Sequence, residues 1–582
     1  MEKKQIAEIL DEMGTLLELK GENPFRVRAY RNASLVISTL NADLAQLAAQ
    51  GTLTSIKGIG KGLAEIITEL MRTGTSKEHE QLRASVPAGL REMLRIQGLG
   101  PKRIKLLYEK LGLTSIDALR KACEEHRLMA LEGFAAKTEE NILKSIQHLS
   151  SMSSKHLYST AREAADALVT EISRVKGVQR CEVAGSLRRR KELIGDIDII
   201  ASVPAVHRKR VFDAFTSHEH VLTILARGDT KSSVILKNGI QCDLRVVEER
   251  EYPFALNYFT GCKEHNVEMR LRALKRGLSL NEYAFTRTEN PAMRGKTVPV
   301  CKDEDDIYRA LGLAFVPPEL RENQGEFDAA EKDEFPHLID NADIRGTFHC
   351  HTNASDGVNT LEEMAEAARA LGWEYLGIAD HSKAAAYAGG LSPAKVKAQI
   401  RAIDRWNDAN EEFRLFKGTE CDILTDGSLD YSDNLLASFD YVVVSIHSKF
   451  KMTQSEATKR ITTALKNRHV TMLGHPTGRL LLEREGYPVD MTEVINVAAG
   501  ERKAIEINAH PMRLDLDWRF VRYAKEKGVP IFINPDAHTT EGLKDVFYGV
   551  GIARKGWLEA KDVVNAWKTA SVEKFLKALQ KG

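Results

Sequence analysis

Two acidic side chains, Asp196 and Asp198, stand two positions apart in the apolar segment 193–200. Side chains alternate between the two faces of a β-strand, so both carboxylates point to one face while Ile197 and Ile199 point into a core. Two neighbouring carboxylates repel each other unless a cation lies between them, and oxygen ligands favour Mg²⁺ or Mn²⁺. The pair therefore predicts a divalent-metal site.

A third carboxylate, Asp243, lies on a strand of a predicted hairpin, because Asn-Gly at 238–239 between two apolar segments is typical of a tight two-residue turn. Asp243 then faces away from the buried residues of its strand, which are Ile240, Cys242, Leu244 and Val246. Three strand carboxylates suit two-metal phosphoryl transfer, and Gly185, Ser186 and Arg189 offer a cradle for phosphate. For the first pair alone, an exposed Asp-x-Asp on a solvated strand is the simpler alternative.

The second half of the chain has a different chemistry, because its short apolar strands end in His, Asp or Glu and most are followed by a helical segment. Repeated β-then-α units with polar residues at the strand ends indicate a barrel with its active site at that end. In the pair His349 and His351 both imidazoles share one strand face, which suits chelation of one metal. The full set of candidate ligands is His349, His351, Asp356, His381, Glu420, His447, His475, Asp536 and His538.

The first 150 residues are predicted to be helical, with two segments that pair an apolar residue with Gly-x-Gly before a helix. Glycines at such a helix N-terminus let backbone amides approach a phosphate, as in helix-hairpin-helix motifs that bind the DNA backbone without reading sequence. The predicted DNA-contacting residues are Gly58, Gly60, Lys61, Gly98, Gly100 and Lys102.

The charge differs between the halves of this 582-residue chain. Residues 1–317 carry 49 Lys and Arg against 41 Asp and Glu, and residues 318–582 carry 34 against 41, so the first part suits a polyanionic partner. The seven cysteines contain no CxxC pair, and no segment reaches the roughly 18 apolar residues of a membrane span. We expect a cytoplasmic protein without membrane contact and with reduced thiols.

The first half resembles the nucleotidyltransferase palm of family X DNA polymerases, through the Gly-Ser-x-Arg-Arg, Gly-Asp-Ile-Asp and later strand Asp motifs and the segment 258–261. The resemblance implies template-dependent addition of dNTPs, with Asp196, Asp198 and Asp243 as catalytic Mg²⁺ or Mn²⁺ ligands. It also implies a nucleotide site made of Gly185, Ser186, Arg189, Gly195, Tyr258, Phe259, Gly261, Asn266 and Arg270. Some relatives cleave abasic-site sugars with a lysine where this chain has Ile66, which cannot form an imine, so a family-type lyase is not expected.

The nine-ligand set resembles that of the PHP (polymerase and histidinol phosphatase) domain, in which a distorted barrel holds three metals. The resemblance implies Mn²⁺ or Zn²⁺ and three groups of ligands: His349, His351, Glu420 and Asp536; Glu420, His447 and His475; and Asp356, His381 and His538. Asp380, Asn508 and His510 are expected to support the ligands or contact substrate.

Together these features resemble a bacterial or archaeal family X DNA polymerase with a C-terminal PHP domain, a multidomain fold with a helix-hairpin-helix region, an α+β palm and thumb, and a distorted (β/α) barrel. The expected parts are 1–90 (DNA-end binding), 91–150 (second helix-hairpin-helix), 151–250 (palm), 251–317 (thumb), 318–340 (linker) and 341–582 (PHP).

The resemblance implies a monomer that fills gapped or nicked DNA and trims DNA 3′ ends in base excision repair. Abasic-site incision and removal of 3′ blocking groups are plausible additions. Two alternatives stay open: the barrel is a small-molecule phosphatase, or the chain is chiefly a DNA-end-binding scaffold.

Overall fold

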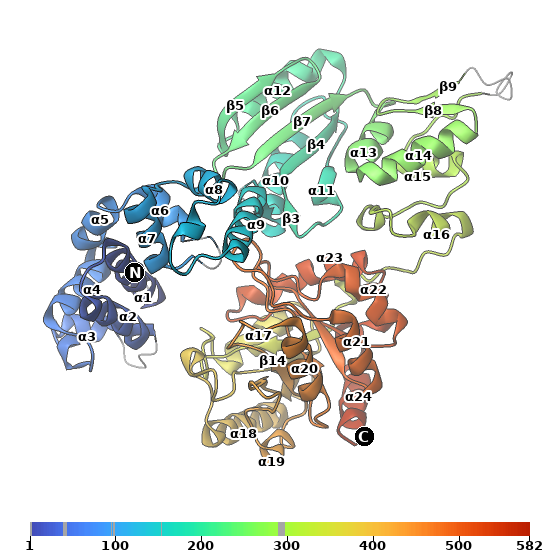
Figure 1. Ribbon diagram of the computed structural model, residues 1–582. Helices are drawn as coiled ribbons and strands as arrows, with labels where there is room; N and C mark the ends of the chain where they lie inside the picture. The colour runs from blue at the N-terminus through green and yellow to red at the C-terminus, as the bar shows by residue number, and fades with distance from the viewer. Residues whose placement is uncertain are drawn as a thin grey trace. The chain divides into compact units, whose positions relative to one another are not determined.

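The structure is a computed structural model that describes residues 3–38, 44–94, 96, 99–152, 154–288 and 297–581 (Figure 1). Contacts between residues divide the chain into two units, Met1–Ser154 and Lys155–Gly582. Among the described residues, every helix is too short or too polar to cross a membrane.

The first unit is helical and has its own apolar core, which includes Ile6, Leu10, Ile67 and Leu107. The first helix ends before Pro24, as the sequence predicts, and Pro24 occupies the first position of the next helix. The elements are α1 (Lys3–Lys20), α2 (Pro24–Ser38), α3 (Leu44–Ala49), η1 (Leu53–Ser55), α4 (Lys61–Thr73), α5 (Lys77–Ala84), α6 (Ala88–Met93), α7 (Pro101–Leu111), α8 (Ile116–Glu124), η2 (Leu128–Ala130) and α9 (Ala136–Met152).

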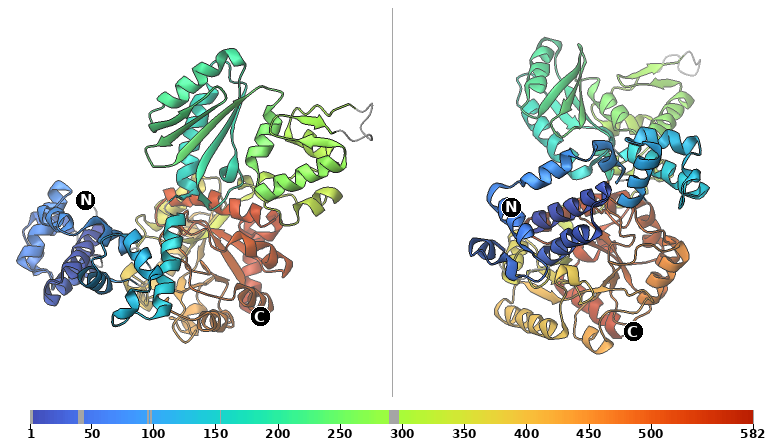
Figure 2. Two further views of the ribbon diagram at one scale, coloured as in Figure 1. Left: turned by 45° about the horizontal axis from the view of Figure 1, so that its top comes forward. Right: turned by 60° about the vertical axis from the view of Figure 1, so that its left-hand side comes forward.

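The palm is a five-stranded sheet with strand order β2-β4-β7-β6-β5. Apolar residues of alternate strand positions pack on helices α10 and α12, which cover one face of the sheet (Figures 1 and 2). The opposite face is thereby free for polar side chains. The elements are β1 (His156–Leu157), α10 (Tyr158–Ser173), β2 (Arg180–Val183), α11 (Gly185–Arg188), β3 (Leu193–Ile194), β4 (Asp196–Ser202), η3 (Ala205–His207), α12 (Arg208–Ser217), β5 (Val221–Arg227), β6 (Lys231–Leu236) and β7 (Gln241–Val247).

The thumb follows the palm and includes most of the segment expected to be a linker. That segment differs from the expectation, because it contains a helix and because Arg321 and Glu326 are fully buried. Arg321 is paired with Glu304, and Glu326 accepts hydrogen bonds from His265 and from the amides of Asn323 and Gln324, which makes the burial possible. The elements are α13 (Tyr252–Thr260), α14 (Lys263–Lys275), β8 (Leu278–Leu280), β9 (Phe285–Arg287), α15 (Glu304–Ala310), η5 (Pro318–Leu320) and α16 (Glu326–Lys332).

The C-terminal domain contains a three-stranded and a five-stranded parallel sheet. Bridges Cys350–Ala537 and His381–Glu420 join the two sheets, so the strands close into a distorted barrel with helices outside.

The elements of this domain are η6 (Asn341–Asp343), β10 (Gly346–Cys350), α17 (Leu361–Ala370), β11 (Tyr375–Ile378), η7 (Ala386–Ala388), α18 (Pro393–Ala409), β12 (Arg414–Lys417), β13 (Glu420–Asp422), α19 (Asp433–Leu436), β14 (Val443–Ser445), α20 (Gln454–Leu465), β15 (Met472–Leu473), α21 (Met491–Gly500), β16 (Ala504–Asn508), α22 (Trp518–Glu526), β17 (Ile531–Asn534), η8 (Glu541–Asp545), α23 (Val546–Lys555), η9 (Ala560–Asp562), η10 (Val564–Ala566) and α24 (Thr569–Lys581).

Candidate active sites

The three strand carboxylates of the palm come together because β4 and β7 are parallel neighbours. Asp198 is the register partner of Asp243, and Asp196 lies two residues earlier on the same face. Burial, reinforced by the charges of Asp196 and Asp243, raises the pKa of Asp198 to about 7. Lys231 places Nζ 2.6 Å from Oδ2 of Asp243. The cluster thus concentrates negative charge that a divalent cation would neutralise.

Gly185 places a backbone turn directly against this cluster. Its φ is +61°, and a Cβ atom at this position would lie 2.6 Å from Oδ2 of Asp198. Ala184 donates its N–H to the Asp198 carbonyl at 2.8 Å. Only glycine fits here, so the turn that carries Ser186 is held next to the carboxylates.

Arg189 connects that turn to the thumb. Its guanidinium donates to the Thr260 carbonyl and, through Nε at 3.1 Å, to Oε1 of Glu322. Gly261 has φ +66°, and its Cβ position lies 3.3 Å from Nη1 of Arg189. Arg189 of the predicted phosphate cradle therefore contacts the segment 258–261, which is also predicted to belong to the nucleotide site.

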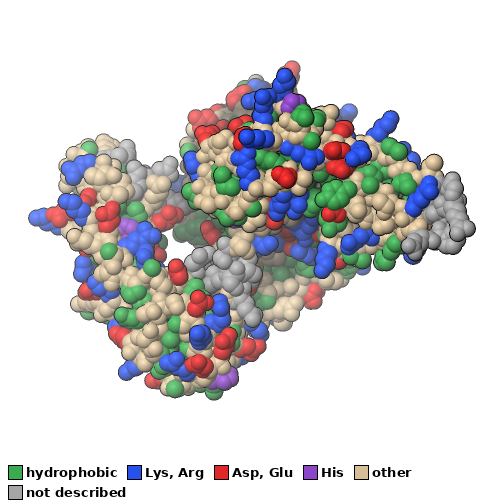
Figure 3. Space-filling view, turned by 90° about the horizontal axis from the view of Figure 1, so that it is seen from above, with side chains coloured by type: hydrophobic (Ala, Val, Ile, Leu, Met, Phe, Trp, Pro, Cys, Tyr) green, Lys and Arg blue, Asp and Glu red, His purple; other side chains and the backbone are tan. Residues whose placement is uncertain are grey.

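Three thumb residues that the sequence singled out, Tyr258, Asn266 and Arg270, lie around one small cavity. Its other lining residues are Phe254, Asn257, Met269, Leu280 and Asn281. Asn266 donates Nδ2–H to the Tyr258 carbonyl at 2.6 Å. Phe259 packs edge-on against Tyr258 and lies beneath the guanidinium of Arg245. Figure 3 shows Lys and Arg side chains among Asp and Glu side chains on the surface seen from above.

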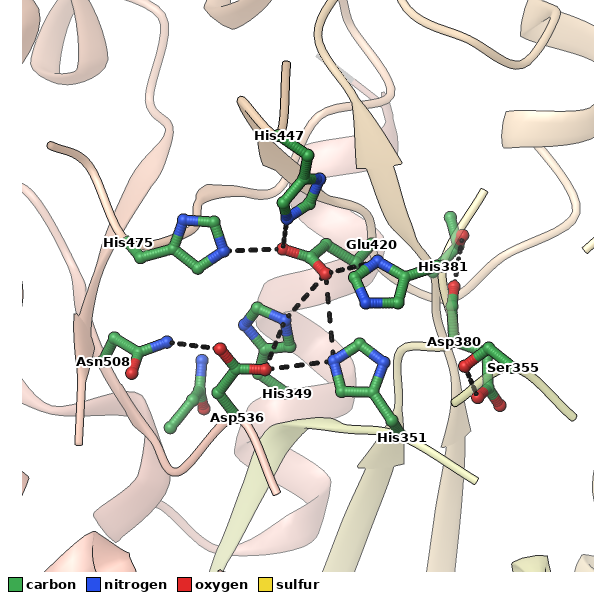
Figure 4. A network of polar contacts seen from close by, with 12 residues as sticks. His349, His351, Ser355, Asp380, His381, Glu420, His447, His475, Asn508 and Asp536 are labelled. Atoms are coloured by element: carbon green, nitrogen blue, oxygen red, sulfur yellow. Dashed lines mark hydrogen bonds and ion pairs between the residues drawn. The ribbon is translucent and has the colours of Figure 1, made fainter. Parts of the chain in front are cut away.

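The nine predicted ligands of the barrel converge at the carboxyl ends of the strands (Figure 4). Glu420 lies at the centre: Oε1 is 3.1 Å from Nε2 of His447 and 2.9 Å from Nε2 of His475, whereas Oε2 is 3.4 Å from Nε2 of His349. One carboxylate therefore reaches two groups of imidazoles, which is the geometry of a bridging ligand.

Three groups of potential ligand atoms each lie within 4.8 Å of one another: His349, His351 and Asp536; His381, Glu420 and His447; and His351, Asp356, His381 and His538. They overlap the three expected groups without coinciding with them. Glu420 is absent from the first group, His381 stands where His475 was expected in the second, and His351 is added to the third. His381 belongs to both the second and the third group. Its Nδ1 is 2.9 Å from Oε2 of Glu420 and its Nε2 is 3.6 Å from Oδ2 of Asp356.

Several ligand atoms of the barrel centre are buried without a hydrogen-bond partner, as atoms that bind a cation would be. Within the described part of the chain, Nε2 of His349, Nδ1 of His351 and Oε2 of Glu420 are buried without a hydrogen-bond partner. Buried polar atoms are normally satisfied, so such a cluster of donor atoms fits bound cations. Imidazoles and carboxylates suit Mn²⁺ or Zn²⁺. Asp356 and His538 are about one-third exposed, which opens the centre on their side.

In the barrel centre, carboxylates and imidazoles stabilise each other's charged forms. Burial disfavours the anion of Glu420, but His447, His349 and His381 prevail and hold its pKa well below the usual range. Burial likewise opposes the cation of His447, whereas Glu420 and Asp422 raise its pKa to about 10. Cation binding at His447 must therefore displace a proton from its imidazole.

Two buried carboxylates that orient the ligands were not predicted. Glu506 accepts from Nδ1 of His349 at 2.8 Å and from the His475 amide at 2.6 Å, and Asp422 lies 2.9 Å from Nδ1 of His447. Such partners fix the ring orientation of a metal-ligating histidine. The sequence signal was an acidic residue inside an apolar strand, Ile-Glu-Ile at 505–507.

The three residues expected to support the centre have distinct positions. Asp380 accepts from the amide and hydroxyl of Thr352 at 2.8 and 2.7 Å, which shapes the turn before Asp356. Asn508 donates to Oδ2 of Asp536 at 3.2 Å, and His510 follows in the same loop and accepts from the Met512 amide. Arg513, which was not predicted, places Nε 3.4 Å from Oδ2 of Asp536.

The helix-hairpin-helix residues lie at exposed helix N-termini. Gly60 and Gly100 precede α4 and α7, and a Cβ atom at either glycine would meet nothing within 4 Å. Lys61 and Lys102 are exposed beside them, and Gly58 has φ +101°. Gly98 lies outside the described residues. Ile66 is buried on α4.

Four family models of known proteins match separate parts of the chain. Family models described as "Helix-hairpin-helix domain", "SAM-like Helix-hairpin-helix tandem", "DNA polymerase beta thumb" and "PHP domain" match residues 1–76, 90–148, 255–322 and 347–510.

Among relatives, "DNA polymerase/3'-5' exonuclease PolX" of Bacillus subtilis is 39% identical over 99% of this chain and 100% of its own length. "DNA polymerase lambda" of Rattus norvegicus is 22% identical over 54% of this chain and 56% of its own. "Probable phosphatase" of Caldicellulosiruptor saccharolyticus is 30% identical over 33% of this chain and 78% of its own.

Fold and sites thus define the class of beta-type polymerases joined to a PHP metal centre. Within that class, the chain belongs to the PolX family of DNA polymerase/3'-5' exonucleases.

Proposed function

We propose that the chain fills short gaps in DNA with its palm and trims DNA 3′ ends with its barrel. The observation that carries the polymerase half is the pairing of Asp198 with Asp243 beside the glycine turn at Gly185. For the nuclease half it is the cluster of imidazoles and carboxylates around Glu420, most of which are buried. Family membership supports both activities in one enzyme.

In the palm, the chain's own residues set the geometry of transfer. The carboxylates of Asp196, Asp198 and Asp243 would hold Mg²⁺ or Mn²⁺, and such cations activate the attacking oxygen and neutralise the developing charge. The turn at Gly185–Ser186 and Arg189 would receive the triphosphate of a dNTP. The cavity beside Tyr258 and Arg270 would border its sugar and base. Exposed amides at Gly60 and Gly100 would hold the DNA backbone.

In the barrel, the imidazoles and carboxylates would hold up to three Mn²⁺ or Zn²⁺ ions, which polarise phosphoryl oxygens and supply a nucleophile at neutral pH. Glu506 and Asp422 keep the ligand rings oriented. Arg513 stands beside Asp536 with its guanidinium available to a phosphate oxygen. Because the centre opens at Asp356 and His538, a strand end would enter from that side.

The proposed role is base excision repair, in which gap filling and end trimming act on the same substrate. Abasic-site incision and 3′-block removal would use the hydrolytic centre of the barrel. We place the protein in the cytoplasm, since its proposed substrate is genomic DNA and its seven cysteines are all free thiols.

The direct test offers the wild-type chain a gapped duplex with a 5′-phosphate and Mn²⁺. We expect extension through the gap with dNTPs and shortening of the 3′ end without them. Binding of the duplex with neither reaction would favour the scaffold alternative and contradict the proposal.

A second candidate for the barrel is hydrolysis of small phosphomonoesters, favoured by the likeness to two proteins named "Probable phosphatase". Phosphate release from histidinol phosphate with DNA ends left intact would support it. We expect the opposite preference, since the barrel is attached to a DNA-binding region with helix-hairpin-helix motifs.

A further inference from the structure

The loop that follows the glycine turn of the palm, residues 185–192, is held by a helix of the barrel domain. We call residues 185–192 the phosphate loop. Lys555 at the end of α23 buries its side chain completely and donates from Nζ to the Arg189 carbonyl at 2.9 Å. The same Nζ donates to the Glu319 carbonyl at 3.2 Å and lies 2.9 Å from Oε1 of Glu322. A barrel residue therefore fixes the backbone of the proposed triphosphate site.

One face of α23 is shaped for this loop. Phe547, Gly551 and Lys555 are four residues apart and so lie in a row along the helix. Arg190 stacks over the ring of Phe547 at 5.3 Å, and its Cδ lies 3.0 Å from the Cβ position of Gly551. Arg190 adopts φ +53°, an uncommon conformation for a residue with a side chain. The helix thus supports a backbone conformation that the loop would not favour alone.

Glu322, on the thumb, also takes part in the contact between α23 and the phosphate loop. Its Oε1 accepts from Nε of Arg189 at 3.1 Å and from Lys555, and its Oε2 lies 3.1 Å from Nζ of Lys191. Glu319 pairs with Arg190 and Arg554 at 3.4 and 2.8 Å. Arg554 also lies 3.7 Å from Asp340. Five basic residues therefore face three carboxylates, so the cluster keeps a surplus of positive charge. Such a surplus is complementary to a nucleoside triphosphate.

We propose that Lys555 is a positioning residue for nucleotide addition: from the barrel domain, it holds the Arg189 backbone so that the phosphate loop is preorganised for the triphosphate of the incoming nucleotide. The inference rests on the proposed polymerase function. It makes nucleotide affinity in the palm depend on the barrel domain, although the barrel has its own reaction. Preorganisation lowers the ordering cost of binding, so the effect falls on affinity more than on the maximal rate.

The test compares Lys555→Met with the wild-type chain in single-turnover extension of a gapped duplex at increasing dNTP concentration. This measurement separates the apparent dissociation constant of the nucleotide from the maximal rate. We expect the constant to rise about tenfold, within the range of energetic coupling between sites, while the maximal rate changes less than threefold. Trimming of 3′ ends should stay within twofold of wild type, which shows that the barrel remains folded.

Lys544→Met is the matched control, because Lys544 is an exposed lysine just before α23 that pairs only with Glu541 among the contacts described for it. It should leave both reactions unchanged. Gly551→Val is a second route to the same loop, since the new side chain would push against Arg190; it too should raise the nucleotide constant. If Lys555→Met also loses trimming, the barrel of that variant is damaged, and the nucleotide dissociation constant of Gly551→Val is used in its place to test the inference.

Extension by the wild-type chain tests the proposed function, and the ratio of nucleotide constants between variant and wild type tests this inference. A constant within twofold of wild type in the folded variant would overturn it. So would a fall confined to the maximal rate.

Discussion

Glu506 accepts a hydrogen bond from Nδ1 of His349 at 2.8 Å, and both side chains are fully buried. The contact leaves Nε2 of His349 directed at Glu420. The other Glu506 oxygen accepts from the backbone amide of His475, so one carboxylate orients a ligand and the turn of a second ligand. A carboxylate–histidine pair of this kind fixes the ring and increases its basicity.

The first prediction follows from that pair. Glu506→Gln keeps the side-chain size but removes the charge, and we expect the apparent affinity for Mn²⁺ in 3′-end trimming to fall about 10–100-fold. The measurement is the trimming rate as a function of Mn²⁺ concentration. Glu412→Gln, at an exposed position on the same domain, is the control and should change nothing. An unaltered Mn²⁺ dependence in Glu506→Gln would show that this contact does not tune the centre.

A second prediction concerns the turn at Gly185. Gly185→Ala would place a methyl group 2.6 Å from Oδ2 of Asp198 and would require an alanine at φ +61°. Because displacement of reacting groups by about 1 Å can cost about 100-fold in rate, extension should fall by about that factor. Trimming should be unaffected. Gly500→Ala, where a Cβ atom meets nothing within 4 Å, serves as the control. Near-normal extension by Gly185→Ala would mean that the turn is not part of the polymerase site.

A third prediction concerns pH and the contact between palm and thumb. Burial opposes ionisation of Glu304, but Arg321 and Arg188 prevail and lower its pKa to about 2. Because this pKa lies below that of an unfolded glutamate, the stabilisation is present above about pH 4.5 and is lost as pH falls toward about 2. The shift corresponds to on the order of 3 kcal/mol.

The measurement is the thermal melting temperature at pH 7 and pH 4. Glu304→Gln should melt well below the wild type at pH 7, and the difference should shrink at pH 4. Glu411→Gln, at an exposed position, should follow the wild type at both values. A difference that stays constant with pH would argue against an ionised Glu304.

The sequence predicted those parts that depend on local pattern. The Asn-Gly hairpin is present, with Gly239 at φ +86°. Its loop has three residues, 237–239, rather than the expected two, because Ile235 pairs with Gln241 and the Leu236 amide donates to the Ile240 carbonyl. Cys242 and Leu244 on β7 are fully buried, as is Ile240 just before it. His349 on β10 and His351 directly after it are both buried, and their ring nitrogens belong to one group of potential ligands with Asp536. Period-two alternation and turn chemistry are local properties, so they can be inferred without the fold.

Other features depend on distant residues. Glu326 looks like a surface charge, yet it is buried because His265, 61 residues earlier, pairs with it. Lys555 ends an ordinary helix, and its partner Arg189 is 366 residues away. Charged residues are usually exposed unless paired, and the sequence alone does not reveal the partner. The sequence predicts a linker over 318–340 for the same reason, because the partners that bury its charged residues are distant in the sequence.

The most direct test of the two-site account uses one gapped duplex, Mn²⁺, and two double variants of the full chain. Asp196→Ala/Asp198→Ala removes two palm carboxylates, and His349→Ala/His351→Ala removes two barrel imidazoles. The account predicts that the first variant loses extension and keeps 3′ trimming, whereas the second loses trimming and keeps extension. Normal trimming by the barrel variant, or normal extension by the palm variant, would contradict it.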